Sequence, residues 1–316
     1  MPPSPSDDQR APLHLPRQTP MNGCAICNQT DALVPYFPVK SRAHAALPWV
    51  MKCTRCQLVL AHPQPSDEEL ASIYDDNYYE QFGFAGSRAS TGLVSTKEAT
   101  FWSLLEHAEP ALPAGLVAPR LLDVGCGLGF SLLAASARGF VATGLDPLAP
   151  ANPATLPGRV IRRGTLEDTT LDEPFDIITM VDAIEHVRDP ARTIQGARAN
   201  LTKNGILVLA TNDVESLGQR IMGHRWTHFH RAHLWFFSPK TLHDVVRDNG
   251  FEVLSTRHFQ RTYNLDYIAS ILARGSNFPV ARTASEAVLR TCPKGLRNQP
   301  WPPITEGFAL VARVRL

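Results

Sequence analysis

Three glycines at alternate positions follow a short apolar run near the middle of the chain: Gly125, Gly127 and Gly129. Residues 121–124 before them have the apolar character of a buried strand, and a compact apolar helix follows them. Glycine lets the backbone pass close to a bound molecule, and the start of the helix offers free N–H groups. A second strand then ends at Asp146, whose carboxylate is placed to accept hydrogen bonds from a ribose diol. These residues predict an adenosine-binding site.

The spacing of the glycines distinguishes two kinds of adenosine cofactor. Dinucleotides need a third glycine later in the turn, as in G-x-G-x-x-G, so that the helix packs closely and receives a pyrophosphate. Phe130 stands at that position, and Asp123 places a negative charge where a pyrophosphate would be repelled and a cationic sulfonium accepted. The turn resembles motif I of class I S-adenosylmethionine-dependent methyltransferases. Taken alone, G-x-G-x-G also suits a purely structural strand–helix turn.

A segment rich in imidazole follows later in the chain. The fifteen residues 224–238 contain four histidines and two tryptophans, and Ser238 with Pro239 then forms a good N-cap and first turn of a helix. Because the pKa of histidine is near neutrality, such a side chain can accept a proton from an acceptor molecule as a methyl group arrives. We expect His233 to be this base, with His230 as the next candidate. For each, a hydrogen bond to a neighbouring carbonyl group is the alternative role.

Two C-x-x-C pairs lie near the N-terminus: Cys24, Cys27, Cys53 and Cys56. Four thiolates within reach of one another predict a tetrahedral metal site, and their softness favours Zn²⁺. Because no coordination position is left open, the site should be structural and not catalytic. The alternative is a group of buried cysteines without metal.

Strand-like and helix-like segments alternate after the glycine turn. Strands are expected over residues 141–145, 160–163, 175–181, 205–211, 251–259 and 306–315. Alternation of this kind predicts parallel strands with crossover helices, hence an α/β, doubly wound sheet with helices on both faces. In such sheets the ligand binds at the carboxyl ends of the strands, where the loop that contains His230 and His233 should also lie.

The stretch from Phe175 to Pro190, FDIITMVDAIEHVRDP, is similar to the F-D…E-H-x-x-D-P segment of ubiquinone-pathway O-methyltransferases. With the glycine turn, it extends the resemblance to class I methyltransferases from Leu121 to about Val253. The resemblance implies S-adenosylmethionine as cofactor and a mostly parallel, seven-stranded, Rossmann-like sheet whose last strand is antiparallel. It also implies a set of cofactor contacts: Asp123, Gly125, Gly127, Gly129, Phe130, Asp146, Leu166, Glu167 and Met180.

The E-H pair of that stretch has its own implied role. In relatives the histidine that corresponds to His186 helps to close the cofactor side of the site, so we count it among the catalytic candidates. Asp182, Glu185 and His186 also match an acidic-acidic-histidine set that holds a divalent ion in some ubiquinone-pathway relatives. A helix cap with a buried polar contact is the alternative interpretation of these residues.

Four segments are expected along the chain. They are a disordered lead (1–20), a zinc ribbon-like module (21–62), a helical lid or linker (63–115) and the methyltransferase domain (116–316). Ser66 to Glu69 forms a capping box that begins a helix, and aromatic residues follow it from Tyr74 to Phe84. These aromatics could cover a substrate or pack the module onto the core. The cysteine pairs with this segment also resemble the N-terminal arrangement of deoxysugar C-methyltransferases.

Composition limits the range of functions. The chain has 316 residues, 44% of them hydrophobic, and a net charge of +1, which argues against a broad nucleic-acid-binding surface. Apolar runs fall short of a membrane span and the N-terminus lacks a signal pattern, so we expect a cytoplasmic protein. We expect a small-molecule acceptor, with O-methylation of a secondary metabolite, sugar or lipid-like precursor first, and carbon or nitrogen acceptors open. The alternatives are an RNA or protein methyltransferase, or an inactive cofactor-binding protein. The sequence does not indicate the oligomeric state.

Overall fold

The computed structural model describes residues 23–24, 26–74, 84–85, 88–89, 91–149, 160–261, 263–266, 268–269, 279–297, 299 and 304–315. The lead expected over residues 1–20 lies outside this part of the chain. So do three members of the aromatic run: Tyr78, Tyr79 and Phe82.

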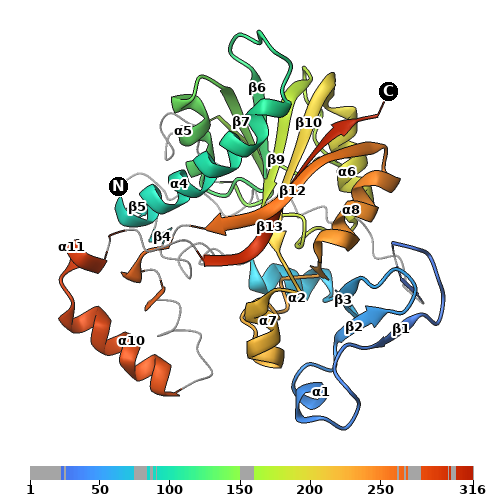
Figure 1. The fold of residues 1–316 in the computed structure, drawn as a ribbon, viewed down its shortest axis with the longest axis vertical. Coiled ribbons are helices and arrows are strands. Elements are labelled where there is room, and N and C mark those ends of the chain that lie inside the picture. The colour runs from blue at the N-terminus through green and yellow to red at the C-terminus, as the bar shows by residue number, and fades with distance from the viewer. Residues whose placement is uncertain are drawn as a thin grey trace, which may run out of the picture.

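A seven-stranded sheet forms the centre of the molecule (Figure 1). In spatial order its strands are β12 (Phe251–Arg261), β13 (Ile304–Val314), β10 (Leu201–Asn212), β9 (Phe175–Val181), β6 (Arg120–Val124), β7 (Val141–Asp146) and β8 (Ile161–Arg163). Strands β6 to β10 pair in parallel, whereas β13 runs antiparallel to both of its neighbours, β10 and β12. The expected sheet, with its antiparallel last strand, is confirmed.

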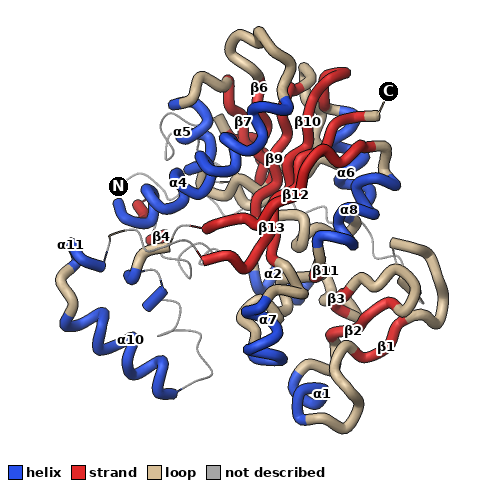
Figure 2. The backbone as a smooth tube through the Cα atoms, in the orientation of Figure 1, coloured by secondary structure: helices blue, strands red, loops and turns tan. Residues whose placement is uncertain are grey.

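Helices cover both faces of this sheet, and four of them are α4 (Thr91–Ala108), α5 (Phe130–Ala137), α6 (Pro190–Ala199) and α8 (Pro239–Asp248). Since successive strand residues point to opposite faces, Leu121 and Ile177 pack in one core with α4 and α5. Leu122 and Ile178 pack in the other core with α6 and α8. Figure 2 shows the two helix pairs on opposite sides of the strands.

Local sequence signals explain where these helices begin. The Asp189 side chain accepts a hydrogen bond from the N–H of Arg192 and Pro190 occupies the first turn of α6. Ser238 and Thr241 form a capping box at the start of α8. Helix α5 instead has Gly129 as its N-cap residue, which has φ +70° and provides no side-chain cap. Its first N–H groups are therefore not capped by the side chain of the residue at its start.

A second, antiparallel sheet includes Cys53, and the other three N-terminal cysteines lie outside its strands. Its strands, in spatial order, are β1 (Leu33–Pro35), β2 (Val50–Cys53), β3 (Val59–Ala61) and β11 (Trp235–Phe236). The fourth strand comes from the segment directly after His233, a connection that the sequence did not indicate.

The other described elements are short or lie at the edges of the molecule. They are α1 (Arg42–Ala46), α2 (Asp67–Ile73), β4 (Phe84–Ala85), β5 (Arg88–Ala89), η1 (Glu109–Ala111), α7 (Leu217–Met222), η3 (Gly223–Arg225), α10 (Pro279–Thr291) and α11 (Lys294–Arg297). The capping box expected from Ser66 to Glu69 is present at the start of α2.

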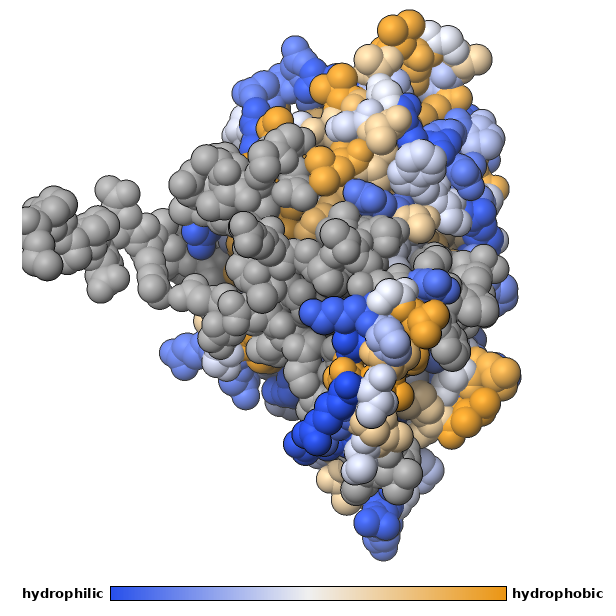
Figure 3. Space-filling model, turned by 90° about the vertical axis from the view of Figure 1, so that its left-hand side faces the viewer, coloured by the Kyte–Doolittle hydropathy of each residue, from blue (hydrophilic) through white to orange (hydrophobic). Residues whose placement is uncertain are grey.

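Among the described residues, no helix combines the length and the apolar character that a membrane crossing requires. On the face drawn in Figure 3, hydrophilic and hydrophobic side chains of the described residues are interspersed.

Candidate functional site

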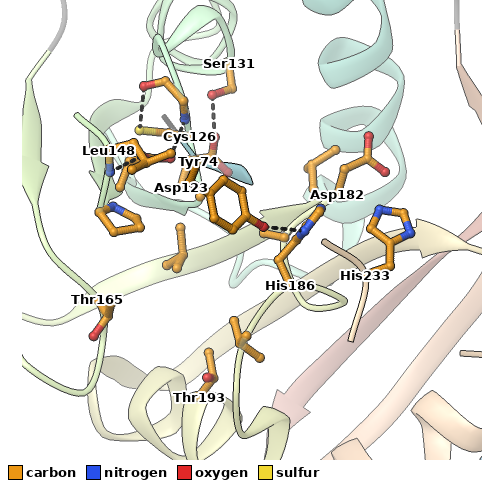
Figure 4. Close-up of a pocket in the computed structure, with 18 of the residues that line it drawn as sticks. Tyr74, Asp123, Cys126, Ser131, Leu148, Thr165, Asp182, His186, Thr193 and His233 are labelled. Atoms are coloured by element: carbon orange, nitrogen blue, oxygen red, sulfur yellow. Dashed lines mark hydrogen bonds between the residues drawn. The ribbon is translucent and has the colours of Figure 1, made fainter. Parts of the chain in front are cut away.

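A cavity of about 480 Å³ lies at the carboxyl ends of β6, β7 and β9. The glycine turn and the end of β7 line one part of it, and histidine side chains line another (Figure 4). The strand ends thus bring together the two groups of residues that the sequence had singled out separately, as expected for a doubly wound sheet.

Backbone hydrogen bonds hold the glycine turn against the end of β7. The N–H of Gly127 donates to Oδ2 of Asp146 at 2.8 Å, and the N–H of Leu148 donates to Oδ1 of the same carboxylate at 2.8 Å. Gly125 has φ +74°, and a Cβ there would lie 2.6 Å from Cβ of Ala183. Both the backbone conformation and the close approach therefore require glycine at this position.

Asp123, the carboxylate before the turn, is buried and accepts hydrogen bonds from two hydroxyl groups. Thr179 donates to its Oδ1 at 2.6 Å, and Ser131 on α5 donates to its Oδ2. Burial raises the pKa of Asp123 to about 6, against the lowering effect of these hydroxyls. This side chain therefore connects β6, β9 and α5 directly beneath the turn.

Most of the other expected cofactor contacts also line the cavity. Phe130, Leu166 and Glu167 are among its walls. Two expected contacts do not line it: Gly129 is the N-cap residue of α5, and Met180 is fully buried in the core on the α6 and α8 side.

The part of the cavity away from the glycine turn is lined by imidazoles. We call residues 226–234 the histidine loop, which contributes His228, His230 and His233, while His186 follows β9. The ring centroid of His233 lies 4.6 Å from that of His186 and 3.8 Å from that of His230. The structure thus brings all three histidines that we named as catalytic candidates into one cluster.

The hydrogen bonds of His186 define its tautomer. Its Nδ1 lies 2.9 Å from the carbonyl oxygen of Ala232 and 2.8 Å from the hydroxyl oxygen of Tyr74. Because a carbonyl oxygen can only accept, we assign the proton of the neutral ring to Nδ1, which leaves a lone pair on Nε2. Burial lowers the pKa of His186 to about 4, so the ring is neutral at pH 7.

Burial shifts the pKa values of the neighbouring groups in opposite directions. It lowers the pKa of His233 well below the usual value, and nearby imidazoles add to this effect. It raises the pKa of Glu185 to about 8, assisted by the negative charge of Asp182. Ligand atoms of Glu185, His186 and His233 lie within 4.8 Å of one another, so this cluster has the composition of a metal site. His233 takes the place that the sequence had suggested for Asp182.

Asp182 is instead engaged by a residue that the sequence analysis missed. Arg261, at the end of β12, donates from Nη2 to Oδ1 of Asp182 and lies with Nε 3.4 Å from Oδ2. Lys97 and Tyr263 line the same part of the cavity. A lone arginine at the end of a predicted strand carries no local signal of this role, because the pairing of β12 with β13 decides where Arg261 lies.

The four N-terminal cysteines form a compact cluster outside the cavity. The sulfur atoms of Cys24 and Cys56 are 3.5 Å apart, and those of Cys27 and Cys53 are 3.6 Å apart. All four are free thiols, and they qualify together as a group that could hold one metal ion. The contact with Cys56 lowers the pKa of Cys24 to about 5, so one thiolate is already favoured.

Comparisons with known proteins agree with this geometry. A family model described as "Methyltransferase domain" matches residues 94–256. The ubiquinone biosynthesis O-methyltransferase of Histophilus somni (strain 2336) is 40% identical over 110 residues, 31% of this chain and 46% of that protein. The protein of the same name from Pseudomonas paraeruginosa (strain DSM 24068 / PA7) is 30% identical over 181 residues, 48% of this chain and 77% of that protein. The chain spans about half the length of the first of these curated relatives.

Among solved structures, the [4+2]-cyclase SpnF superposes on this chain with a TM-score of 0.53 at 19% identity. The match covers 80% of this chain and 98% of that one. At this level of identity, the likeness shows the fold and leaves the reaction to the residues of the cavity.

Proposed function

Because the chain belongs to the class I S-adenosylmethionine-dependent methyltransferases, we propose that its cavity serves methyl transfer to a small-molecule acceptor. The observation that carries this proposal is the composition of the cavity, with an adenosine-type glycine turn and Asp146 in one part and clustered imidazoles in another. O-methylation is the first choice, because the relatives named above are O-methyltransferases and imidazole is suited to deprotonate a hydroxyl group.

The cofactor half of the cavity has a defined set of donors and acceptors. Asp146 lines the cavity at the end of β7, and a carboxylate is the kind of group that accepts hydrogen bonds from ribose hydroxyls. The glycines allow the ligand to approach the backbone, and Leu166 and Phe130 offer apolar walls. Asp123 lines the cavity, and its pKa of about 6 leaves it mostly ionised at pH 7, so its negative charge would favour a cationic sulfonium. We assign cofactor binding to these residues.

The part of the cavity that would hold the methyl acceptor has two tasks: to position that molecule and to provide one general base. S-adenosylmethionine supplies a methyl group that is already activated by its sulfonium. The protein must therefore hold the acceptor in line and exclude water. We assign the role of base to His233, which burial keeps unprotonated at pH 7. His186, bonded through Nδ1 to Ala232 and Tyr74, and His230, in ring contact with His233, hold the acceptor beside it.

We propose that the cysteine cluster holds one structural Zn²⁺. Thiolates around tetrahedral zinc lie about 2.3 Å from the ion, which places the sulfur atoms roughly 3.8 Å apart. The sulfur separations of 3.5 and 3.6 Å are close to this value, and the thiols are free. Four thiolates fill all positions, so the ion would have no part in methyl transfer. Free thiols also agree with a reducing, cytoplasmic environment.

The experiment that tests the function uses labelled S-adenosylmethionine and a panel of phenols, catechols and hydroxylated sugars, with amines and RNA as competing classes. We expect transfer of label to a hydroxyl compound. With that acceptor, His233→Asn should lower kcat by about 10²- to 10⁴-fold, because general base catalysis contributes that much. Binding of S-adenosylhomocysteine should be unchanged, since the cofactor half is intact.

The matched control is His258→Gln, an exposed histidine on β12 that does not line the cavity. It should leave both kcat and cofactor binding as they are. Unchanged transfer in His233→Asn and His230→Asn would remove the base assignment. Cofactor binding without transfer to any class on the panel would argue against an active methyltransferase.

A further inference from the structure

The sheet in which Cys53 ends β2 is completed by β11, which continues the chain from the histidine loop. Strand β11 pairs antiparallel with β3, with Trp235 opposite Leu60 and Phe236 opposite Val59. In Figure 2, β11 lies beside β3, and β1 and β2 follow to the lower right of the large sheet. The residue that immediately precedes β11 is Leu234, and His233 comes before it.

Leu234 is held by hydrogen bonds from two directions. Its N–H donates to the carbonyl oxygen of Glu185 at 2.8 Å, which ties it to the segment after β9. Its own carbonyl oxygen accepts from the N–H of Ala61 at 2.9 Å, which ties it to β3. Leu234 is fully buried, so neither bond exchanges readily with water. The backbone beside His233 is therefore fixed jointly by the large sheet and by the N-terminal sheet.

Side chains reinforce the contact between the histidine loop and the N-terminal residues. Arg231 lies 5.3 Å from the ring centroid of Trp49 and 3.7 Å from a carboxylate oxygen of Glu69. Phe229 and Val59 belong to one buried apolar cluster, which also contains Val50, Trp226 and Phe236. The two strands next to the cysteines thus pack directly on the loop that lines the cavity.

The cysteine cluster fixes the end of the N-terminal sheet from which β3 starts. Cys53 ends β2, and its N–H donates to the carbonyl oxygen of Leu58 at 2.9 Å, which closes the turn into β3. Cys56 lies within this turn, and Cys24 and Cys27 reach it from the preceding segment. Strands β2 and β3 have only 4 and 3 residues, so a metal cross-link at the turn between them would add to the order that β1 and β11 provide on either side.

We propose that the metal-loaded cysteine cluster is the positioning device for the histidine loop: it orders β2 and β3, and β3 holds β11 and Leu234 so that His233 faces the cavity. The acceptor half of the site then depends on the metal, while the cofactor half, built on β6, α5 and β7, does not. The proposal relies on the proposed function only for the role of His233. The dependence of the order of the histidine loop on the cysteine cluster does not rely on it.

The test is hydrogen exchange of the full chain, purified with Zn²⁺ and saturated with S-adenosylhomocysteine, compared with Cys24→Ser and Cys56→Ser. We expect peptides over residues 226–236 to exchange at least about tenfold faster in both variants, because local opening is no longer opposed by the module. Peptides over residues 120–146 should keep their protection, and the Kd for S-adenosylhomocysteine should change less than about twofold. The matched control is Cys292→Ser, which removes a thiol outside the cluster.

A second variant keeps the cysteines and breaks only the contact. Ala61→Pro removes the N–H group that donates a hydrogen bond to the carbonyl oxygen of Leu234. Hydrogen exchange over residues 226–236 should therefore become faster, while the chain still binds one Zn²⁺. Unchanged exchange of the histidine loop in the cysteine variants would overturn the proposal. Loss of protection over residues 120–146 as well would also overturn it, because the cluster would then support the whole fold. Since exchange is measured without methyl transfer, failure of the proposed function would leave these readouts intact.

Discussion

His233 and Glu185 have ligand atoms within 4.8 Å of each other, and burial moves their pKa values in opposite directions. Burial disfavours the charged form of each group, so it lowers the pKa of the imidazole and raises that of the carboxyl to about 8. At pH 7 the imidazole is unprotonated and the carboxyl is mostly protonated. The site therefore places a neutral base, His233, beside a neutral acid, Glu185.

The first residue-scale prediction concerns the pH dependence of methyl transfer. A histidine base is active only while unprotonated, and the lowered pKa of His233 keeps it so below its ordinary value of 6.5. We expect the acid limb of the kcat/KM profile to lie clearly below pH 6.5, measured by initial rates with circular dichroism to confirm folding. An acid limb centred at pH 6.5 would show that the base is a solvated histidine.

The second residue-scale prediction concerns Glu185. The raised pKa of Glu185 contributes to the free energy of unfolding. This contribution is fully present below pH 4.5, the pKa in the unfolded chain, and is lost as the pH rises through about 8, the pKa in the folded protein. Glu185→Gln mimics the protonated acid and does not ionise. In urea unfolding, the free energy of unfolding of the variant should therefore rise relative to that of the native protein by a few kcal/mol between pH 5.5 and pH 8.5. The control, Glu252→Gln, is exposed on β12 and should show no such trend. If the difference in free energy of unfolding between Glu185→Gln and the native protein were the same at every pH, the raised pKa of Glu185 would be contradicted.

At the scale of elements, local signals were sufficient for some features and insufficient for others. The glycine turn, the caps of α6 and α8 and the cysteine pairs could be predicted because spacing within a few residues decides them. Strand β11 could not, because it has two residues and exists only through pairing with β3, far earlier in the chain. The position of Arg261 in the cavity could not be predicted for the same reason, since it follows from the pairing of β12 and β13.

An element-scale prediction isolates the close approach in the glycine turn. Gly125 and Gly139 both have positive φ, at +74° and +88°, but only Gly125 faces a neighbour, Ala183, at short range. Each change to alanine should cost about 1–2 kcal/mol of stability through the strain of a positive φ, and Gly125→Ala should cost more because of its contact with Ala183. Only Gly125→Ala should also weaken binding of S-adenosylhomocysteine, by about tenfold or more, because the added methyl group displaces the turn. Equal cofactor affinity in the two variants, measured by calorimetry, would show that the turn does not contact the cofactor.

At the scale of the whole molecule, one side chain joins the last part of the sheet to its centre. Arg261 starts from β12 and reaches Asp182 beyond β9, although β13 and β10 lie between those strands. Gly307 on β13 lies beside this side chain: a Cβ there would lie 2.7 Å from Nη1 of Arg261 and 2.4 Å from the backbone oxygen of Thr211. The ion pair therefore ties the antiparallel end of the sheet to the parallel centre next to the cavity.

Arg261→Met should destabilise the protein by about 3 kcal/mol, because removing one partner leaves the charge of Asp182 partly buried with Lys97 as its remaining strong counter-charge. This is the low end of the usual range, since 34% of the Asp182 side chain is exposed whereas only 7% of Arg261 is. The double variant Arg261→Met with Asp182→Asn should recover part of the loss, because no uncompensated carboxylate remains. Arg282→Met, which breaks an exposed pair with Glu286 on α10, is the control and should cost less than about 0.5 kcal/mol. If urea unfolding gave equal losses for Arg261→Met and Arg282→Met, the connection across the sheet would carry no more stability than a surface ion pair.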